Sequence, residues 1–359
     1  MGDGYRIAVV GATGAVGGTV LEILAQRASL PIAEIVALAS ERSAGAEVPF
    51  GDERLACRAL GDDTVDGSDL VFSAAGGSIS REWAPRFAAA GALVIDKTSY
   101  WRTDPQVPLV VPEVNPDVVS DIPKGILSSP NCSTMQLVVA LNPIRQAVGI
   151  EEIVVSTYQS VSGSGRVAID ELETQAADLL AGRPAKAEVF PHQVAFNAMP
   201  QVETFQDEAK PDYIGYSTEE IKIMRESRRI FGLDPDDDAA LPIHPTCVRL
   251  GIKVGHSQSI RVRTTGPMTP EECREELRGA PGITVVDDPQ AAQYPMAIDA
   301  AGTDDVLVGR IRRVPGLERA LNLWVVGDNL RKGAALNAVQ IAELLHSRGA
   351  IGRGARAAA

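Results

Sequence analysis

The feature that most constrains the fold is a glycine-rich loop near the start of the chain, Gly11-Ala-Thr-Gly14-Ala-Val-Gly17. It follows an apolar run at residues 5–10 and precedes apolar residues at helical spacing up to Ala28, so we expect a strand, a tight loop and a helix. Glycines in such a loop let backbone N–H groups approach a pyrophosphate at the positive end of the helix. The G-x-x-G-x-x-G spacing is looser than the dinucleotide fingerprint, and a plain glycine turn is the alternative. Its place after the first strand favours a nucleotide.

The 359 residues suffice for about two domains. Over roughly the first 130 residues, short buried strands alternate with helices, which is typical of a doubly wound parallel sheet. From Glu151 onward the apolar runs are longer and more β-branched, so we expect a mixed sheet in a second domain. The expected strands cover residues 35–39, 69–73, 92–95, 153–157 and 248–254, and the expected helices cover 80–90, 168–181, 218–231 and 333–346.

The charge balance limits the classes of partner. The chain has 34 basic and 47 acidic residues, a formal net charge of −13, and no Lys/Arg-rich run. Nucleic acid and anionic membranes are therefore unfavourable partners. The N-terminus lacks the basic region of a signal peptide, and no segment approaches the roughly 20 apolar residues of a membrane span. We therefore expect a cytoplasmic protein that binds neither nucleic acid nor membrane.

Four cysteines, Cys57, Cys132, Cys247 and Cys273, are scattered without a C-x-x-C pair, and the four histidines show no ligand spacing against them. We therefore expect no metal site and, in a reducing compartment, no disulfide. Cys132 differs from the others because it directly precedes an apolar helical run. A helix N-terminus stabilises a thiolate and can hold an oxyanion, so this cysteine is a candidate nucleophile. A small buried core residue is the alternative, and it is the interpretation we give the other three.

The end of the second strand indicates the cofactor. An enzyme that prefers NAD usually has an acidic residue here for the ribose hydroxyl, whereas Arg42 between two serines could hold a 2′-phosphate. We therefore expect NADP, with Glu41 facing solvent.

His256 follows a β-like run, where a lone histidine is usually structural. Cys132 favours a catalytic role for His256, because a cysteine nucleophile acting on a carbonyl needs an acid/base with a near-neutral pKa. Arg249 lies seven positions earlier, which would place the two side chains on opposite faces of an unbroken strand. Gly251 and Gly255 offer places for the chain to turn between them.

The helix expected at residues 218–231 has a start signal, because Ser217 and Glu220 fit a capping box. Glu219 and Lys222 share a face of this helix, which by itself indicates a solvated ion pair. The glycine-rich strand end at residues 158–165 is either a turn or a loop over a cofactor.

Taken together, these residues resemble the aspartate-semialdehyde dehydrogenases, which share a fold and a thioester mechanism with the phosphorylating glyceraldehyde-phosphate dehydrogenases. The resemblance covers nearly the whole chain. The most specific motifs are PNCST and YQSVSG. The others, in the order that the family uses, are GATGAVG, LAS-x-RSAG, TSYWR, VPLVVPEVN, AFNAMPQ, EEIKIMRES, CVRLGIKVGHSQS, VGRIRR and WVVGDNLRKGAALNAVQIAE.

The resemblance implies the catalytic roles. Cys132 would be the nucleophile, His256 the acid/base, and Gln159 the group that orients the covalent intermediate. Arg249 and Glu219 would hold the carboxylate and the ammonium of the substrate.

The resemblance also implies the anion-binding residues. Phosphate would be held by Arg102, Lys222 and Asn131. The residues that would contact NADP are Gly11, Thr13, Gly14, Ala15, Val16, Arg42, Ser43, Ser162, Gly163 and Asn329. The implied roles of Glu219 and Lys222 reverse the surface-pair interpretation.

The expected architecture is α/β, with a Rossmann-type NADP domain of residues 1–131 plus 330–359 and a mixed α+β catalytic and dimerisation domain of residues 132–329. The family implies a homodimer. It also implies reversible, NADP-dependent conversion of L-4-aspartyl phosphate to L-aspartate 4-semialdehyde through a cysteine thioester, in lysine, threonine, methionine and isoleucine biosynthesis.

Two positions depart from the family pattern: Lys97 replaces the usual asparagine after Asp96, and the run Leu250-Gly251-Ile252 replaces the usual apolar–proline pair after the arginine. Both leave room for a shifted substrate preference. The alternatives are the same chemistry on a related acyl phosphate such as N-acetyl-glutamyl phosphate, a non-redox cysteine hydrolase, and a nucleotide-sensing protein.

Overall fold

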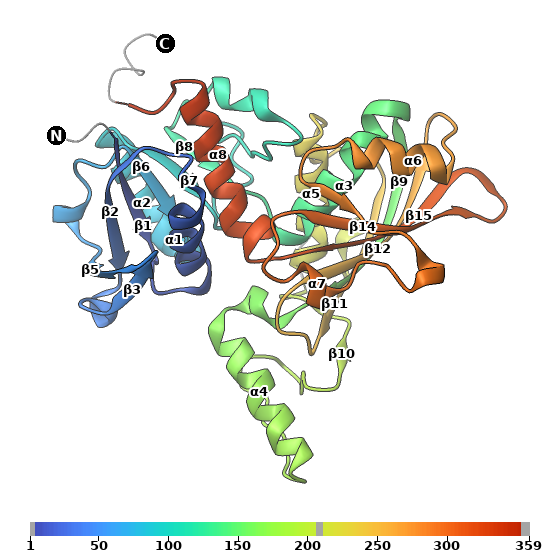
Figure 1. Cartoon of the computed structure of the whole chain (residues 1–359), viewed down its shortest axis with the longest axis horizontal. Helices are drawn as coiled ribbons and strands as arrows, with labels where there is room; N and C mark the ends of the chain where they lie inside the picture. The colour runs from blue at the N-terminus through green and yellow to red at the C-terminus, as the bar shows by residue number, and fades with distance from the viewer. Residues whose placement is uncertain (1–3, 206–210, 353–359) are drawn as a thin grey trace. The chain divides into compact units, whose positions relative to one another are not determined.

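The computed structural model describes residues 4–205 and 211–352. The chain forms two compact units, residues 1–130 with 334–359 and residues 131–333. Each unit is built around its own β-sheet (Figure 1). The architecture of a parallel-sheet unit and a mixed-sheet unit confirms the fold class expected from the sequence.

The first unit contains a six-stranded parallel sheet in the order β5-β2-β1-β6-β7-β8. Its strands are β1 (Tyr5–Val10), β2 (Ile32–Ala39), β5 (Arg58–Ala59), β6 (Leu70–Ser73), β7 (Leu93–Asp96) and β8 (Ile126–Ser128), and a hairpin is formed by β3 (Glu47–Phe50) and β4 (Glu53–Ala56). Its helices are α1 (Ala15–Arg27), α2 (Gly77–Ala89) and α8 (Leu336–Ser347). The helix expected at 333–346 therefore starts slightly later, after a π-helical turn at Arg331–Ala335.

Strand β1 shows why this sheet is buried on both faces. Ile7 and Val9 pack in one apolar cluster with α1 and α8, whereas Ala8 and Val10 pack in another with α2. All four side chains are buried, as expected for a central parallel strand. Because β2 lies on one side of β1 and β6 on the other, the loop after β1 occupies the topological switch point of the sheet.

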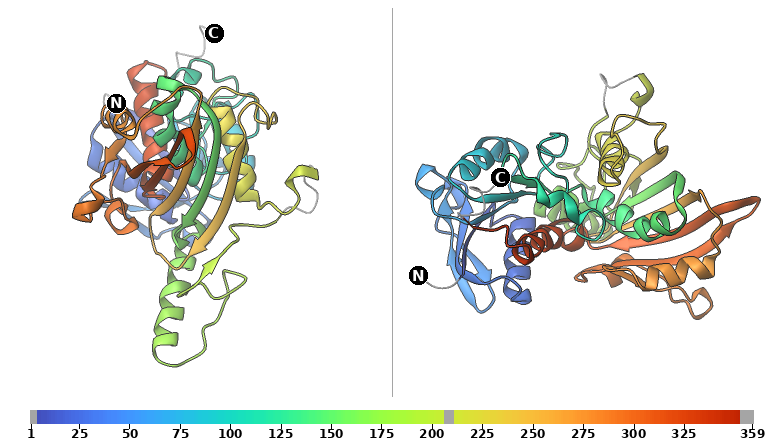
Figure 2. Two further views of the ribbon diagram at one scale, coloured as in Figure 1. Left: turned by 90° about the vertical axis from the view of Figure 1, so that its right-hand side faces the viewer. Right: turned by 90° about the horizontal axis from the view of Figure 1, so that it is seen from above.

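The second unit contains a seven-stranded mixed sheet in the order β10-β11-β9-β12-β15-β14-β13. Its strands are β9 (Ile150–Gln159), β10 (Ala198–Met199), β11 (Ile243–Leu250), β12 (His256–Thr264), β13 (Ile283–Val285), β14 (Val306–Val314) and β15 (Leu317–Gly327). Its helices are α3 (Cys132–Val148), α4 (Arg166–Leu180), α5 (Thr218–Ile230), α6 (Pro270–Arg278) and the short α7 (Ala297–Ala300). Helix α4 projects away from the sheet (Figure 2).

The prediction of one strand over residues 248–254 is wrong beyond Leu250. β11 ends at Leu250, and β12 begins at His256 after an irregular turn. Gly251 fits this turn because a Cβ there would lie 2.8 Å from the carbonyl oxygen of Val194. Gly255 has φ +94°, a conformation that side chains disfavour. Arg249 and His256 therefore stand on different strands.

Candidate active site

Cys132 is the first residue of α3, and Asn131 is its N-cap. The Asn131 Oδ1 accepts hydrogen bonds from the backbone N–H groups of Ser133 (2.8 Å) and Thr134 (3.1 Å), which fixes the first turn. Gly333 faces Cys132 so closely that a Cβ there would lie 2.9 Å from the Cβ of Cys132. The sequence-based placement of this cysteine at a helix N-terminus is therefore confirmed.

The accessibility of the four cysteines separates Cys132 from the rest. Cys132 is half-buried, whereas Cys57, Cys247 and Cys273 are buried. Burial raises the pKa of each of these three thiols above its ordinary value. A raised pKa disfavours the thiolate, which is the reactive form.

A buried carboxylate joins two of the predicted site residues. Glu219, on α5, accepts the Gln159 Nε2–H at Oε1 (2.8 Å) and the Asn131 Nδ2–H at Oε2 (2.9 Å). Its side chain is 3% exposed. Glu226, one heptad further along α5, accepts the backbone N–H of Asn131 at 2.6 Å. Helix α5 therefore holds both the N-cap of α3 and the Gln159 side chain.

Lys222 continues this cluster at its exposed end. Its Nζ bonds Glu203 Oε1 (2.6 Å) and lies 3.8 Å from Glu219 Oε2. Lys222 and Glu219 are thus part of one site on α5, not a pair in open solvent. The capping box of Ser217 and Glu220 that starts this helix is confirmed.

Arg249, near the end of β11, is 4% exposed and donates from Nη1 to the carbonyl oxygen of Ser160. Its guanidinium also lies over the Phe190 ring, 5.6 Å from the centroid. Burial lowers the pKa of Arg249, and the negative charge of Glu219 opposes that change. The Ser160 carbonyl oxygen and the Phe190 ring therefore fix the position of the planar guanidinium.

His256, at the start of β12, is completely buried. Its Nδ1 lies 3.1 Å from the Ser160 backbone nitrogen, which donates to it, and 3.0 Å from Ser160 Oγ. Within the described residues, Nε2 has no hydrogen-bond partner. A Cβ on Gly163 would lie 3.6 Å from both this Nε2 and Arg249 Nη1, so the two groups border one space over a glycine.

Asn329 and Ser162 stand beside His256 in the same unit. The Asn329 Oδ1 accepts from Ser160 Oγ (3.0 Å), Ser162 Oγ (3.2 Å) and the Gly255 backbone N–H (3.0 Å). In this structure Asn329 therefore organises the loop around His256. Its predicted contact with the cofactor stays a prediction, as do those of Ser162 and Gly163.

In the first unit, the backbone of the glycine loop packs so closely that only glycine fits at two positions. Gly11 has φ +86°, and a Cβ on Gly17 would lie 2.2 Å from the Gly11 carbonyl oxygen, so both positions need glycine. Gly14, the N-cap of α1, has no side chain to bond the first N–H groups of that helix. Of the predicted contacts within the loop, Thr13 and Gly14 are exposed, and Ala15 and Val16 are half-buried.

Arg42 and Ser43 lie in a short turn directly after β2. The backbone N–H groups of Gly11 and Ala12 both donate to the Leu38 carbonyl oxygen, at 2.8 and 3.1 Å. This pairing ties the glycine loop to the end of β2, and Arg42 follows on the same edge of the sheet. An exposed guanidinium and open helix N–H groups therefore fit a dinucleotide with a 2′-phosphate.

Arg102 also belongs to the first unit, where it is buried and donates from Nη2 to the Lys97 carbonyl oxygen at 2.9 Å. Lys97, the first departure from the family pattern, donates from Nζ to the Pro130 carbonyl oxygen at 2.7 Å. The role of Arg102 in phosphate binding stays a prediction.

Two acidic residues of the site are not predicted from the sequence. Glu226 lies seven positions after Glu219, so helical periodicity could have placed both on one face of α5. Glu203 lies in irregular chain and has a positive φ of 63°, and no motif marks it.

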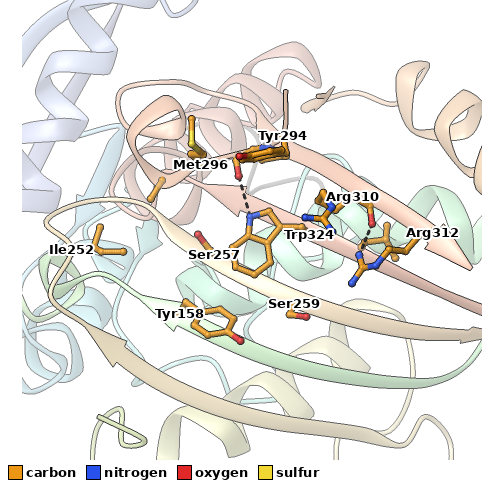
Figure 3. Close-up of a pocket in the computed structure, with 12 residues that line it drawn as sticks. Tyr158, Ile252, Ser257, Ser259, Tyr294, Met296, Arg310, Arg312 and Trp324 are labelled. Carbon is orange, nitrogen blue, oxygen red and sulfur yellow. Dashed lines mark hydrogen bonds between the residues drawn. The ribbon is translucent and has the colours of Figure 1, made fainter. Parts of the chain in front are cut away.

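The second sheet has another face with a different character. Along β9, Gln159 is buried toward the site, whereas the adjacent Tyr158 points to the opposite face. There it lies against Trp324, with ring centroids 5.4 Å apart, in a pocket of about 510 Å³ (Figure 3). Arg310 and Arg312 border the same pocket. This aromatic and cationic surface is distinct from the cysteine site.

A glycine loop at the switch point of a parallel sheet, together with a half-buried cysteine at a helix N-terminus in a mixed-sheet unit, is typical of a nucleotide-dependent enzyme with a cysteine nucleophile. Family comparisons specify the class. Residues 6–122 match the model described as semialdehyde dehydrogenase, NAD binding domain, and residues 141–332 match semialdehyde dehydrogenase, dimerisation domain.

Individual relatives match over nearly the whole chain. The aspartate-semialdehyde dehydrogenase of Aquifex aeolicus is 49% identical, over 97% of this chain and all of the relative. That of Legionella pneumophila is 48% identical, over 95% of each chain. The crystal structure of aspartate-semialdehyde dehydrogenase II from Vibrio cholerae has a TM-score of 0.90 at 44% identity, over 96% of this chain and 99% of that one. The chain belongs to the aspartate-semialdehyde dehydrogenase family.

Metal-binding clusters and membrane-spanning helices are two other features that could indicate function. In the described ranges, no group of three or more His, Cys, Asp or Glu side chains could hold a metal ion. No helix within those ranges has the length and apolarity to cross a membrane.

Proposed function

We propose that this protein catalyses the reversible, NADP-dependent conversion of L-4-aspartyl phosphate to L-aspartate 4-semialdehyde, in the biosynthesis of lysine, threonine, methionine and isoleucine. The observation that carries the proposal is the half-buried Cys132 on the N-terminus of α3, in a unit that also presents a buried arginine and a buried glutamate. One charged group of each sign suits a substrate with a carboxylate and an ammonium. The relatives' names support the same substrate, as does a second Vibrio cholerae structure, described as complexed with ASA.

The roles follow from these groups. Cys132 attacks the acyl carbon, because its position at the N-terminus of α3 favours the thiolate. Gln159 orients the covalent intermediate from a position fixed by Glu219. Arg249 holds the substrate carboxylate through its planar fork. Glu219 receives the ammonium, since each carboxylate oxygen has a second lone pair beyond those used by Gln159 and Asn131.

Phosphate is bound by Lys222, Asn131 and Arg102 in this proposal, and NADP by the glycine loop with Arg42 and Ser43 and by Ser162, Gly163 and Asn329. NADPH supplies a hydride to the acyl carbon when it is bound. The residues 1–131 and 330–359 form the NADP domain, and 132–329 form the catalytic and dimerisation domain. The match to a dimerisation-domain model and the half-buried aromatic pair of Tyr158 and Trp324 support a homodimer. The scattered cysteines, which lack a C-x-x-C pair, support a cytoplasmic location.

The test of this function is an absorbance assay at the nicotinamide band, with a panel of small aldehydes and with phosphate or arsenate. We expect turnover with aspartate semialdehyde. Turnover confined to N-acetyl-glutamate semialdehyde would change the substrate, and no turnover with any aldehyde would reject a dehydrogenase.

Replacing Arg42 with alanine should remove the preference for NADP. Charge-assisted hydrogen bonds to the 2′-phosphate contribute about 1.5–3 kcal/mol, so the ratio of kcat/KM for NADP over NAD should fall roughly 10- to 100-fold. The matched control is Arg54→Ala, because Arg54 is an exposed arginine on the nearby hairpin, paired with Glu47. Equal kcat/KM with both cofactors in the unaltered enzyme would contradict the assignment.

Lys222→Ala should weaken phosphate binding and spare the first half-reaction, in which the aldehyde and NADP give the thioester and NADPH. Loss of one charge-assisted contact predicts a rise of about tenfold or more in the KM for phosphate. The NADPH burst from aldehyde and NADP without phosphate should persist. Lys253→Ala is the control, because Lys253 is an exposed lysine paired with Glu173. An abolished burst would show that Lys222 serves the first half-reaction or the fold.

A further inference from the structure

Asn131, the residue directly before Cys132, holds the whole first turn of α3. Its Oδ1 accepts the backbone N–H groups of Ser133 and Thr134. Its backbone carbonyl oxygen accepts the N–H of Met135 at 2.9 Å. Three successive amides therefore depend on the position of this one residue.

The backbone N–H of Asn131 is held in turn by Glu226. Because Asn131 is the N-cap, this N–H has no acceptor within α3. Glu226 Oε2 accepts it at 2.6 Å, and only 5% of the glutamate is exposed. A hydrogen bond to an ionised acceptor is about twice as strong as one between neutral groups. One carboxylate oxygen on α5 therefore fixes the backbone at the start of α3.

Glu226 differs from Glu219 in the group that it holds. Glu219 receives the Asn131 side chain at Nδ2 and also the Gln159 amide. Glu226 lies seven positions later on the same helix, about 10 Å further along its axis, and holds the backbone. Helix α5 thus contacts Asn131 at two points. Only the backbone contact is separate from the side chains that are proposed to bind the substrate.

We propose that Glu226 is a positioning residue for the nucleophile. Its carboxylate oxygen fixes the Asn131 backbone, and this in turn fixes the direction in which Cys132 presents its thiol. The inference rests on the proposed function, which supplies the reaction that Cys132 performs. Glu226 itself contacts neither substrate nor cofactor in this role.

The negative charge of Glu226 does not favour the reactive form of Cys132. A carboxylate beside the N-terminus of α3 interacts with the same positive helix end that stabilises a thiolate, and two like charges disfavour each other. The benefit to the reaction is therefore geometric, because it comes from an acceptor oxygen at the reach of a glutamate side chain. Reach and charge can be changed independently, so substitutions can separate the two roles.

Two substitutions make this separation. Glu226→Gln keeps an acceptor oxygen at the same reach and removes the charge, whereas Glu226→Asp keeps the charge and shortens the side chain by one methylene. The matched control is Glu220→Asp. Glu220 is also buried on α5, and it accepts the backbone N–H groups of Ser217 at 2.7 Å and Cys247 at 2.8 Å. Its shortening therefore weakens comparable hydrogen bonds at a place other than Asn131.

Hydrogen exchange followed by mass spectrometry, without substrate or cofactor, tests the positioning directly. Glu226→Asp should speed the exchange of the amides of residues 133–135 about tenfold or more, because their acceptors all belong to Asn131. Glu226→Gln and Glu220→Asp should leave these exchange rates unchanged. Unchanged exchange in Glu226→Asp, or fast exchange in Glu226→Gln, would overturn the proposal.

Kinetics test the consequence for Cys132. The rate of the NADPH burst without phosphate should fall about 10- to 100-fold in Glu226→Asp, since a displacement of the reacting group by about 1 Å has an effect of this size. The KM for aspartate semialdehyde and the Kd for NADP should not change. Both aspartate variants should lower the midpoint of thermal unfolding, whereas only Glu226→Asp should slow the burst. Glu226→Gln should retain the burst rate of the unaltered enzyme.

The remaining outcomes are each decisive. A raised KM with an unchanged burst rate in Glu226→Asp would place Glu226 in substrate binding and overturn the positioning role. A burst as slow in Glu226→Gln as in Glu226→Asp would show that the charge is required, which also overturns it. Failure of the unaltered enzyme to give a burst would instead reject the proposed function, and the hydrogen-exchange result would still decide whether Glu226 fixes the start of α3.

Discussion

Cys132→Ser is expected to lose nearly all turnover while NADP binding is retained. The hydroxyl has almost the size of the thiol but a far higher pKa, so the nucleophilic anion is no longer available. The loss should be of the order of 10³-fold or more in kcat, as for the removal of other covalent nucleophiles. The fold should tolerate the change, because Asn131 and not Cys132 caps α3.

Three measurements check this result. Stopped-flow absorbance without phosphate should show no NADPH burst, intact-protein mass should show no acyl adduct, and equilibrium titration should show unchanged NADP binding. Cys57→Ser is the control, since Cys57 is a buried cysteine of the first unit. Iodoacetamide should inactivate the enzyme through Cys132. Equal inactivation through Cys57, Cys247 or Cys273 with Cys132 unlabelled would contradict the assignment.

The fold was predictable where local sequence and tertiary contacts agree. The glycine loop, the start of α1 at Ala15 and the capping box at Ser217 each depend on a few neighbouring residues. The run at residues 248–254 was misjudged because its composition is β-branched up to Val254. Its end is set instead by close packing of Gly251 against Val194, a contact between residues more than 50 positions apart. Such contacts leave no local periodicity in the sequence.

The site shows the same limit. The setting of Cys132 could be inferred because a helix N-terminus has a local signature. By local criteria, Glu219 and Lys222 were an ordinary surface pair, yet the structure shows Glu219 buried against Gln159 and Asn131, 60 and 88 positions away. Family resemblance supplied what periodicity could not. Neither periodicity nor family resemblance predicts the Ser160 backbone contact with His256, because any residue except proline could supply that N–H.

Arg249→Lys is the second change with a large expected effect. The substitution retains a positive charge and removes the planar fork that matches a carboxylate. Arg249 already uses one arm for the Ser160 carbonyl oxygen and lies over Phe190, so its plane is fixed before substrate binds. A lysine ammonium has no plane, and the substrate carbonyl would be misplaced relative to Cys132. We expect a loss of about 2–4 kcal/mol in transition-state stabilisation, roughly 30- to 1000-fold in kcat/KM.

The burst of NADPH measured without phosphate reports this loss in the first half-reaction alone. The burst rate should fall with kcat/KM in Arg249→Lys. The control is Arg261→Lys, which changes a half-exposed arginine of β12 and should leave the burst rate unchanged. A retained charge should not rescue the burst, because the misplaced group is a planar pair of donors and not a point charge. A complete Arg249→Lys burst, as fast as that of the unaltered enzyme, would show that Arg249 does not hold the substrate carboxylate. Its fixed guanidinium plane would then serve only the loop at Ser160.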